Sequence, residues 1–451
     1  MKLFGTDGIR GNASHFPFDN NSLQVIGMAI ARVMKCVNIF IIRDTRLSGK
    51  RIQEELIKGI LHTGALPILG GVMPTAAASY IVTKKNYSAA IVISASHNKY
   101  YDNGIKIFDH HGMKISHLLE SKIELEIYKH ININTSNFKN IVFRNNIICK
   151  EQSIFLKMYE NFIMDQFLPN KLYNKTIIID CANGSVYKCA CTVLKKLGAN
   201  VIALNTNPNG VNINLDCGAL FPYKLSQIIK QNKAFCGFAF DGDADRVVFV
   251  DEKGNIKDGD YFLASMAIWL KKHNKLHNNT LVTTTMCNIG IQRAMAKEDI
   301  KVIFSEVGDY FIIKNMNKYN ASFGGEQSGH FIFKDTLLTG DGLLSSIILL
   351  TILISENITM SEFMNSNNIK KLPQVIVNKH IVKKIPFTKL KKSSLLINVY
   401  EKNLNGRIIV RYSGTEPVIR IMVEGLNQKE IELIANKLAD SIQNEILELT
   451  R

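Results

Sequence analysis

The sequence predicts an α/β protein with three α/β domains built on mixed sheets, followed by a smaller C-terminal α+β domain. Short uninterrupted apolar runs at 38–42, 89–93 and 176–179 are typical of strands buried on both faces of a sheet. Between them, segments such as 48–63 carry apolar residues at helical spacing, with Ser48 as a candidate N-cap. Strands that alternate with helices build α/β layers with mostly parallel pairing.

The end of the chain has a different pattern. Short strands and one final helix are expected there, at 375–377, 407–411, 418–423 and 428–447 respectively. Polar, Asn-rich segments at 132–146 and 365–373 separate the blocks. We therefore expect four domains, at 1–145, 146–250, 251–368 and 369–451.

The charge balance is strongly basic, with 55 Lys and Arg against 39 Asp and Glu and a formal net charge of +16. Such an excess suggests nucleic acid, an anionic membrane or an acidic substrate. However, Lys outnumbers Arg, and the densest Lys cluster, at 371–392, is interleaved with apolar residues as on a solvated face. We expect no nucleic-acid partner, and an acidic small molecule instead.

Other classes are disfavoured by local features. The first residues lack the apolar core of a secretory signal. The longest apolar run, 342–354, is shorter than the roughly 20 residues that span a bilayer, so it predicts a buried helix and no membrane partner. Eight cysteines in 451 residues are too few for a disulfide scaffold, which indicates a reducing, cytoplasmic location.

The first of four polar loops, 93–98, directly follows an apolar strand. Small hydroxyl residues at the carboxyl end of a parallel strand occupy the usual ligand crevice of α/β sheets. Ser96 could be a nucleophile, a phosphate ligand or an N-cap, and local sequence by itself favours the N-cap.

The second loop holds three carboxylates, Asp241, Asp243 and Asp245, within five residues. They repel one another unless a cation lies between them, and hard oxygen ligands suit Mg²⁺ or Ca²⁺. An EF-hand is excluded because Arg246 stands where the loop needs Gly and because strands flank the loop. With only three carboxylates, the site leaves room for a phosphate oxygen.

The third loop, 324–330, combines flexible glycines with Glu326 and Ser328. Two polar side chains at this spacing can chelate neighbouring hydroxyls of a sugar. A tight hairpin with incidental polar residues is an equally good interpretation of this loop alone.

The fourth loop, 411–417, contains Arg411, two hydroxyl residues and a glycine, which together can form an anion nest. Arg420 follows three residues after Pro417 and could add a second guanidinium. The spacing is not that of a Walker A loop, so NTP hydrolysis is not implied. A serine, a metal loop, a hydroxyl chelator and a phosphate cradle together predict phosphoryl transfer on a phosphosugar.

These motifs, in this order, resemble the α-D-phosphohexomutase superfamily, and within it the bacterial branch that isomerises glucosamine phosphates. The similarity runs nearly end to end and includes 4–11, 94–98, 101–106, 241–246, 325–330 and 411–417. It implies four domains around one central cleft, and interconversion of glucosamine 6-phosphate and glucosamine 1-phosphate for cell-wall precursor synthesis. It also implies a phosphorylated Ser96, a priming sugar bisphosphate, and a monomer or homodimer.

The resemblance also assigns roles to individual residues. One Mg²⁺ per chain would be held by Ser96, through its phosphate, and by Asp241, Asp243 and Asp245. The remaining assignments are Arg10, Lys106 and Arg246 as cations, Glu326 and Ser328 as sugar ligands, and Arg411, Ser413, Gly414, Thr415 and Arg420 as ligands of the non-reacting phosphate. We expect burial among other cations to lower the pKa of Lys106 and make it the general acid or base, with His330 as the competitor.

The sequence departs from the superfamily pattern at four positions. Lys99 and Ala76 replace usual prolines, Cys287 a usual Ser and Tyr310 a usual Arg. Three other functions stay open: a phosphoglucomutase or phosphomannomutase, a non-enzymatic binder of nucleic acid or anionic surfaces, and a metal-dependent phosphatase.

Overall fold

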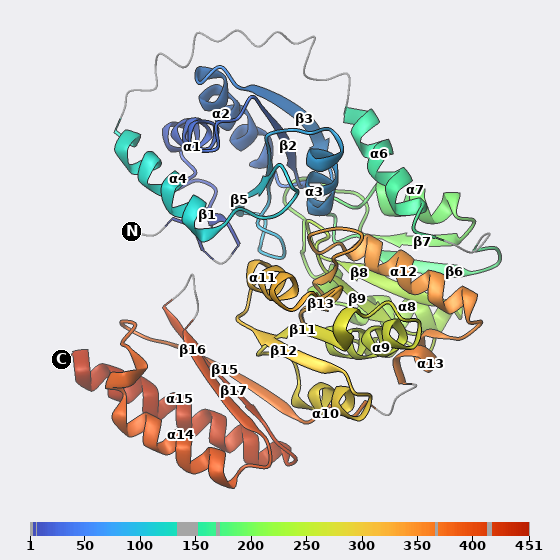
Figure 1. The fold of residues 1–451 in the computed structure, drawn as a ribbon, viewed down its shortest axis with the longest axis vertical. Coiled ribbons are helices and arrows are strands. Elements are labelled where there is room, and N and C mark those ends of the chain that lie inside the picture. The colour runs from blue at the N-terminus through green and yellow to red at the C-terminus, as the bar shows by residue number, and fades with distance from the viewer. Residues whose placement is uncertain are drawn as a thin grey trace.

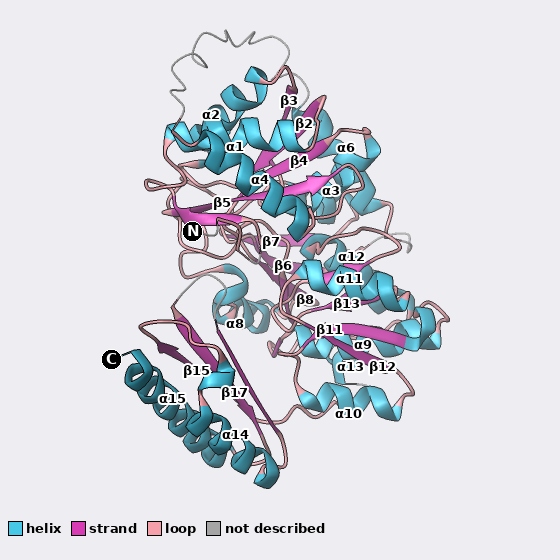
Figure 2. Ribbon diagram, turned by 60° about the vertical axis from the view of Figure 1, so that its left-hand side comes forward, coloured by secondary structure: helices cyan, strands magenta, loops and turns pink. Residues whose placement is uncertain are grey.

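The computed structural model describes residues 3–5, 7–132, 152–167, 172–365, 369–412 and 417–450. They form three mixed α/β sheets and one small antiparallel sheet, which follow one another along the molecule (Figure 1). Helices cover the faces of the sheets (Figure 2). The predicted fold class is confirmed. The Asn-rich segment 132–146 lies outside the described residues apart from its first residue.

The first sheet has the strand order β1-β5-β4-β2-β3; β4, β2 and β3 pair in parallel, β5 pairs antiparallel with β4, and β1 pairs antiparallel with β5. Its strands are β1 (Ile9–Asn12), β2 (Asn38–Arg43), β3 (Leu66–Val72), β4 (Ala89–Ile93) and β5 (Asp102–Asp109). Its helices are α1 (Asn20–Val33), α2 (Gly49–His62), α3 (Thr75–Lys84) and α4 (His117–His130). The predicted strands at 38–42 and 89–93 are β2 and β4, and both are buried almost throughout because helices pack on both faces.

Helix α2 begins directly after Ser48, which occupies the predicted N-cap position but does not cap the helix through its side chain. The Ser48 side chain makes no capping hydrogen bond. Its Oγ instead accepts a hydrogen bond from Asn103 Nδ2 at 2.8 Å, because β5 runs close to the start of the helix.

Helices α1 and α2 approach so closely that glycines are required where they cross. A Cβ added at Gly59 would lie 1.8 Å from the Gln24 carbonyl oxygen, and one at Gly27 would lie 2.2 Å from that of Leu56. In an ordinary helix interior, Gly→Ala stabilises because alanine has the better helix propensity. Here the clash is with backbone, so the two helices can accept a methyl group only by separating.

We expect Gly59→Ala to lower the free energy of unfolding by roughly 1–3 kcal/mol through overpacking. Urea unfolding followed by circular dichroism measures this, with Lys50→Ala as the control because that side chain of the same helix is 76% exposed. A stabilised Gly59→Ala protein would contradict the close approach of the two helices.

The second sheet has the order β10-β9-β8-β6-β7; β8, β6 and β7 pair in parallel, β9 pairs antiparallel with β8, and β10 pairs antiparallel with β9. Its strands are β6 (Thr176–Asp180), β7 (Asn200–Leu204), β8 (Cys236–Phe240), β9 (Val247–Val250) and β10 (Ile256–Lys257). Helices α6 (Gln152–Met164), α7 (Cys189–Lys196) and α8 (Tyr223–Asn232) lie in the same part of the chain.

The third sheet has the order β12-β11-β13-β14, with only β14 antiparallel. Its strands are β11 (Thr280–Thr284), β12 (Lys301–Ser305), β13 (Phe323–Gly325) and β14 (Phe331–Phe333). The helices of this region are α9 (Gly259–Lys272), α10 (Ile289–Lys297), α11 (Asp309–Tyr319), α12 (Gly342–Ser355) and α13 (Met360–Asn365). The predicted buried helix is α12, which packs against β9 of the second sheet and against α6.

The three mixed sheets share one plan, and the polar loops occupy the same place in each. In every case three parallel strands are followed, at one side, by an antiparallel strand joined through a short turn. The β4–β5 turn carries Ser96, the β8–β9 turn carries Asp241 to Asp245, and the β13–β14 turn carries Glu326 and Ser328. The chemistry predicted from sequence therefore lies on corresponding turns of the three sheets.

The C-terminal domain is an antiparallel sheet in the order β15-β17-β16, covered on one face by two helices. Its elements are β15 (Gln374–His380), α14 (Lys391–Asn403), β16 (Arg407–Tyr412), β17 (Val418–Glu424) and α15 (Gln428–Thr450). The expectation of one helix is wrong, since α14 is a second one. Its apolar residues are only partly buried, which weakens the periodic signal. Short 3₁₀ helices occupy Gly218–Leu220, His277–Asn279 and Phe387–Lys389.

Candidate active site

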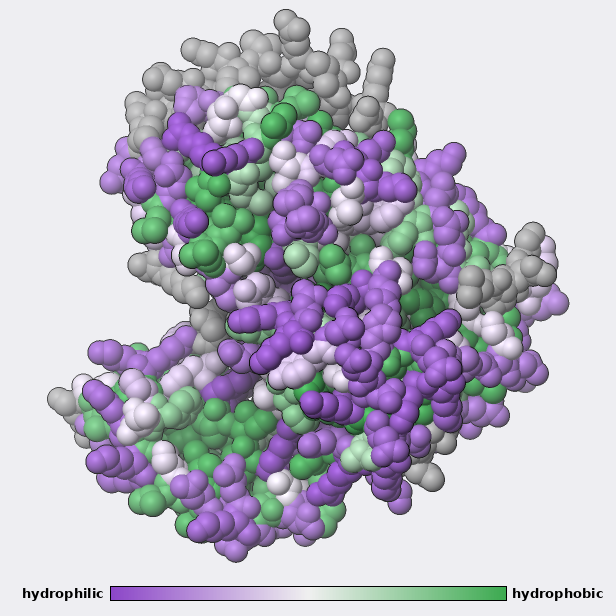
Figure 3. Space-filling view, in the orientation of Figure 1, coloured by the Kyte–Doolittle hydropathy of each residue, from purple (hydrophilic) through white to green (hydrophobic). Residues whose placement is uncertain are grey.

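The corresponding turns and the C-terminal sheet surround a cavity of about 560 Å³. Residues from all four sheets or the turns beside them line it, among them Arg10, Asp245, Arg246, Glu326, Arg411 and Arg420. Figure 3 shows the surface hollowed on the side where the C-terminal domain faces the rest of the molecule. Predicted site residues from loops far apart in the sequence, namely Asp245, Glu326 and Arg411, thus line one cavity, whereas Ser96, Lys106, Asp241, Asp243 and Ser328 are not among the residues that line it.

Ser96 lies in the β4–β5 turn, and its side chain is directed at the turn that holds Asp241, Asp243 and Asp245, which we call the aspartate loop. Its φ of 52° is in the left-handed region, which residues with a β-carbon adopt only where the surroundings hold them there. The hydroxyl Oγ donates a hydrogen bond to Asp241 Oδ2 at 2.6 Å, and the backbone N–H donates to Ser94 Oγ at 2.9 Å. Because β5 follows the turn, rather than a helix, the N-cap interpretation of Ser96 is wrong.

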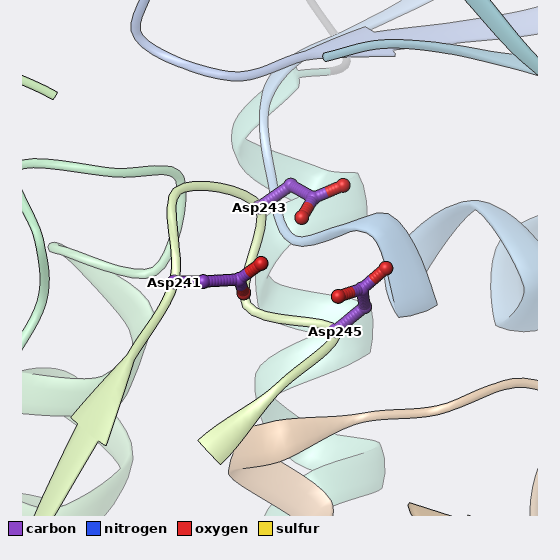
Figure 4. A group of neighbouring side chains, drawn as sticks. All are labelled: Asp241, Asp243 and Asp245. Atoms are coloured by element: carbon purple, nitrogen blue, oxygen red, sulfur yellow. The ribbon is translucent and has the colours of Figure 1, made fainter. Parts of the chain in front are cut away.

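Asp241, Asp243 and Asp245 point toward one another from the β8–β9 turn (Figure 4). One oxygen of each lies within 4.8 Å of those of the other two, and all three side chains are buried. The Oδ1 atoms of Asp243 and Asp245 have no hydrogen-bond partner among the described residues. Burial, with Asp245 and Asp243 nearby, raises the pKa of Asp241 well above its ordinary value. A divalent cation would relieve this repulsion, and the all-oxygen donor set fits Mg²⁺.

Lys106 is enclosed by carboxylates, and the expectation that cations lower its pKa is wrong. Its Nζ lies 2.7 Å from Asp243 Oδ2, 2.9 Å from Asp245 Oδ2 and 3.2 Å from Asp7 Oδ2. Burial would lower the pKa of Lys106, but these three carboxylates raise it well above its ordinary value. Lys106 is therefore an ammonium ion that balances the aspartate loop.

A chain of ion pairs connects this centre with the third domain. Asp7 pairs with Arg10 and with Lys114, and Lys114 Nζ also lies 2.5 Å from Asp309 Oδ2. Burial would raise the pKa of Asp7, but Lys106, Lys114 and Arg10 lower it well below the ordinary value. The carboxylate of Asp7 therefore stays ionised and ties together cations on three segments of the chain.

Glu326 and Ser328 are brought together on the β13–β14 turn, as the chelate hypothesis requires. Ser328 Oγ donates to Glu326 Oε2 at 3.0 Å, and the Gly308 N–H donates to Glu326 Oε1 at 3.1 Å. These bonds fix the carboxylate at the cavity wall, while each of its oxygens keeps a lone pair for a ligand.

His330 ends the same turn and is nearly fully buried. Its Nδ1 lies 3.9 Å from Asp245 Oδ2 and its Nε2 lies 3.6 Å from Asp309 Oδ2. Burial would lower the pKa of His330, but Asp245 and Asp309 raise it. A Cβ added at Gly340 would lie 2.4–2.6 Å from the ring, so that glycine makes room for the imidazole.

Arg411 and Arg420 are cross-strand partners on β16 and β17, on the sheet face that meets the cavity. Burial lowers the pKa of Arg411, and Arg420 lowers it further because the two like charges repel. An anion between them would remove that repulsion. Ser413, Gly414 and Thr415, predicted to complete the cradle, lie outside the described residues.

A second row of cross-strand partners attaches the C-terminal domain to the third domain, four residues from the Arg411–Arg420 pair along β16 and β17. It consists of Gln374, Glu424 and Arg407, and we call it the docking row. Glu424 Oε2 accepts a hydrogen bond from the Ile289 N–H at 3.3 Å, and Arg407 donates to the Cys287 carbonyl. The Arg411–Arg420 pair is therefore held from one end of its own sheet.

Comparison with known proteins identifies the family. Models of the phosphoglucomutase/phosphomannomutase family match along the chain: α/β/α domain I at residues 1–133, domain II at 155–254, domain III at 258–369 and the C-terminal domain at 398–441. The phosphoglucosamine mutase of Geobacter metallireducens is 40% identical over 99% of this chain and 99% of its own. That of Thermodesulfovibrio yellowstonii is 40% identical over 99% and 100%.

The chain belongs to the phosphoglucosamine mutase family. Solved structures show the same fold at lower sequence identity. A phosphoglucomutase/phosphomannomutase family protein from Burkholderia thailandensis has a TM-score of 0.77 and 20% identity, covering 98% of this chain and 97% of its own. The N-acetylphosphoglucosamine mutase of Aspergillus fumigatus, in complex with GlcNAc-6P and magnesium, has a TM-score of 0.66 and 15% identity, covering 98% and 96%.

The contacts of several polar residues near the site were not predicted from the sequence. Asp7 lies inside the recognised opening motif, but the pairing of its carboxylate with Lys106 and Lys114 depends on the folded chain. Asp44 and Arg46 follow the end of β2, and their position after a buried strand is a signal that could have marked them as candidate site residues.

No helix within the described residues is long and apolar enough to cross a membrane.

The four departures from the superfamily pattern lie outside the cavity wall, since none is among the described residues that line it. Ala76 is buried in the first turn of α3, and Cys287 is buried. Tyr310 packs its ring against His117, with centroids 4.5 Å apart. Lys99 is exposed, and its carbonyl accepts a hydrogen bond from Arg46.

Proposed function

We propose that this protein interconverts glucosamine 6-phosphate and glucosamine 1-phosphate by way of a phosphorylated Ser96. The observation that carries the proposal is the hydrogen bond of 2.6 Å from Ser96 Oγ to Asp241, which places the hydroxyl at a cluster of three carboxylates beside the cavity. The full-length relatives named phosphoglucosamine mutase support the choice of substrate.

The proposed cycle has two phosphoryl transfers. The phosphate on Ser96 passes to O6 of glucosamine 1-phosphate or to O1 of the 6-phosphate; the bond from phosphorus to Oγ breaks and the bond to the sugar oxygen forms. The sugar bisphosphate then reorients within the cavity, and its other phosphate is transferred back to Ser96. Such transfers depend mainly on positioning and charge stabilisation, for which Arg10, Arg246 and Lys106 supply cations.

We further propose that Asp241, Asp243 and Asp245, with the phosphate on Ser96, hold one Mg²⁺ per chain. When bound, the ion would draw negative charge away from the phosphoryl group in transfer. A sugar bisphosphate would prime the enzyme by phosphorylating Ser96. The two unpartnered Oδ1 atoms of the aspartate loop support the metal assignment.

Proton transfer has two candidates with different surroundings. Lys106 is held as an ammonium ion by three carboxylates, which favours it as a fixed charge and makes it a weak proton donor. His330 lines the cavity, where the sugar hydroxyl must lose its proton. We therefore propose His330 as the group that exchanges a proton with the substrate.

The remaining assignments follow the walls of the cavity. Glu326 and Ser328 would bind sugar hydroxyls, and Arg411 and Arg420 would hold the non-reacting phosphate, together with Ser413, Gly414 and Thr415. We retain the division at 1–145, 146–250, 251–368 and 369–451, a cytoplasmic location, and a monomer or homodimer without nucleic-acid or membrane partners as parts of the same proposal.

The test is a comparison of kcat/KM on the phosphates of glucosamine, glucose and mannose. We expect a preference of roughly tenfold or more for glucosamine, because the Glu326 carboxylate attracts an ammonium group but only hydrogen-bonds a hydroxyl. A preference for glucose or mannose would instead indicate a phosphoglucomutase or phosphomannomutase. Net release of phosphate without isomerisation would indicate a phosphatase.

A further inference from the structure

Behind Ser96, a second set of contacts holds the backbone of the nucleophile turn. Arg46 directly follows β2, and its side chain is fully buried. Its Nη2 donates to the carbonyls of Ser96 at 2.9 Å and Asn98 at 2.8 Å. Its Nη1 donates to the carbonyls of Lys99 and Asp102, the latter at 3.1 Å. One guanidinium group thus gathers four carbonyls from a seven-residue stretch.

The charge of Arg46 is balanced by the buried carboxylate of Asp44. Asp44 accepts hydrogen bonds from the Arg46 backbone N–H at 2.9 Å and from Nε at 2.8 Å. Asp44 also accepts a hydrogen bond from the Ser94 hydroxyl at 2.6 Å, and Ser94 Oγ in turn accepts one from the Ser96 N–H. The Ser96 backbone is therefore held at both its N–H and its carbonyl by one connected network.

A residue of the second domain repeats the contact from the opposite direction. Asn214 Nδ2 donates to the same two carbonyls, those of Ser96 at 2.9 Å and Asn98 at 3.1 Å. Each of these oxygens thus receives two donors, one from each domain, which uses both of its lone pairs. Gly242 leaves the necessary space, since a Cβ there would lie 2.6 Å from the Ser96 oxygen and 2.7 Å from Asn214 Nδ2.

We propose that Arg46 and Asn214 are positioning residues, forming a two-sided carbonyl clamp that keeps Ser96 in its left-handed conformation with Oγ aimed at the aspartate loop. The proposal rests on the proposed function. A strained conformation of this kind persists only where the surroundings over-determine it, and the clamp supplies that constraint. Lys99, which stands where the superfamily usually has a stiffening proline, is one of the clamped residues.

Loss of the clamp should lower kcat while leaving KM nearly unchanged. It contacts the nucleophile turn but neither Glu326 nor the Arg411–Arg420 pair. A misplacement of about 1 Å at a reacting group can cost roughly 100-fold in rate. We expect Asn214→Asp, which sets a carboxylate against two carbonyls, and Arg46→Lys, which keeps the charge but loses the planar fork, to lower kcat roughly 10- to 100-fold. KM should stay within about threefold of the wild-type value.

Asn209→Ala is the matched control. Asn209 belongs to the same loop as Asn214, and its side chain accepts the N–H groups of Val211 and Asn212 without touching the nucleophile turn. It should leave kcat unchanged. If Arg46→Lys fails to fold, because Asp44 is left with a poor partner, Asn214→Asp alone decides. Wild-type kcat in folded Asn214→Asp, or an equal loss in Asn209→Ala, would overturn the clamp.

Hydrogen exchange of the peptide 94–104 distinguishes failure of the clamp from failure of the proposed function. Asn214→Asp should exchange faster there than the wild type, whereas Asn209→Ala should not, whatever reaction the enzyme catalyses. If glucosamine phosphates prove not to be substrates but the exchange difference is seen, the clamp stands and the substrate assignment falls. Equal exchange in all three proteins overturns the clamp.

Discussion

Ser96→Ala is expected to reduce mutase turnover by roughly 10⁴-fold or more while the protein remains folded, because the change removes the atom proposed to carry the phosphate. The lost hydroxyl also deprives buried Asp241 of a hydrogen bond, which costs roughly 1–3 kcal/mol of stability. Steady-state isomerisation of glucosamine phosphates measures the first effect, and thermal unfolding measures the second.

Ser121→Ala provides the control, because that hydroxyl bonds only within α4 and is exposed. Incubation with a radiolabelled sugar bisphosphate should label the wild type and Ser121→Ala but leave Ser96→Ala unlabelled. If Ser96→Ala retained about a tenth of wild-type turnover, the nucleophile would have to be another residue.

Lys106→Met is expected to lower both stability and activity strongly. The ammonium of Lys106 is the shared partner of Asp7, Asp243 and Asp245, so its removal leaves buried carboxylates facing one another. Removing one partner of a buried ion pair costs about 3–5 kcal/mol. Urea unfolding in EDTA measures this, with Lys50→Met as the exposed control. Added Mg²⁺ should restore part of the loss, because a divalent cation can balance the same charges.

The stability difference between Lys106→Met and the wild type should depend on pH with a defined sign. In the wild type the pKa values of Asp7 and Asp245 lie well below the ordinary value of 3.8, so the contribution of these two carboxylates to stability is present above that pH and disappears as the pH falls further. In the variant these carboxylates are unfavourable when ionised, and acidification relieves them. The difference should therefore shrink on acidification, and it should continue to shrink below about pH 4, where the wild type loses its own contribution. A constant difference would mean that Lys106 contributes only through packing.

The strands and the loops that follow them were predictable because their signals are local. A strand such as β4 or β8 is apolar at every position because it is buried on both faces. The polar residues after it are then conspicuous in the sequence. Polar residues at the strand ends marked the turns that hold Ser96, the aspartate loop and Glu326 as candidates, and the resemblance to the superfamily then assigned the roles of Ser96 and Glu326.

What escaped prediction depends on contacts between distant segments. The pKa of Lys106 was assigned the wrong direction because the carboxylates that decide it, Asp243 and Asp245, belong to another domain. Ser48 was a candidate N-cap, and local sequence by itself favoured an N-cap at Ser96. Asn103 and Asp241 bind the hydroxyls of these two residues instead. The four carbonyls gathered by Arg46 leave no trace in local periodicity, because backbone acceptors are the same at every residue.

The docking row gives the C-terminal sheet the geometry of a lever. Arg411 and Arg420 lie four residues from Arg407 and Glu424 along the same strands, about 13 Å at the usual rise. A tilt of about 10° about the docking row would carry both guanidinium groups through about 2 Å, which is more than the range over which a hydrogen bond forms. A small rotation at one end of the sheet is thus sufficient to bring the Arg411–Arg420 pair, the proposed phosphate ligands, into or out of hydrogen-bonding range of a bound anion, without any change in the turns that hold Ser96 and the aspartate loop.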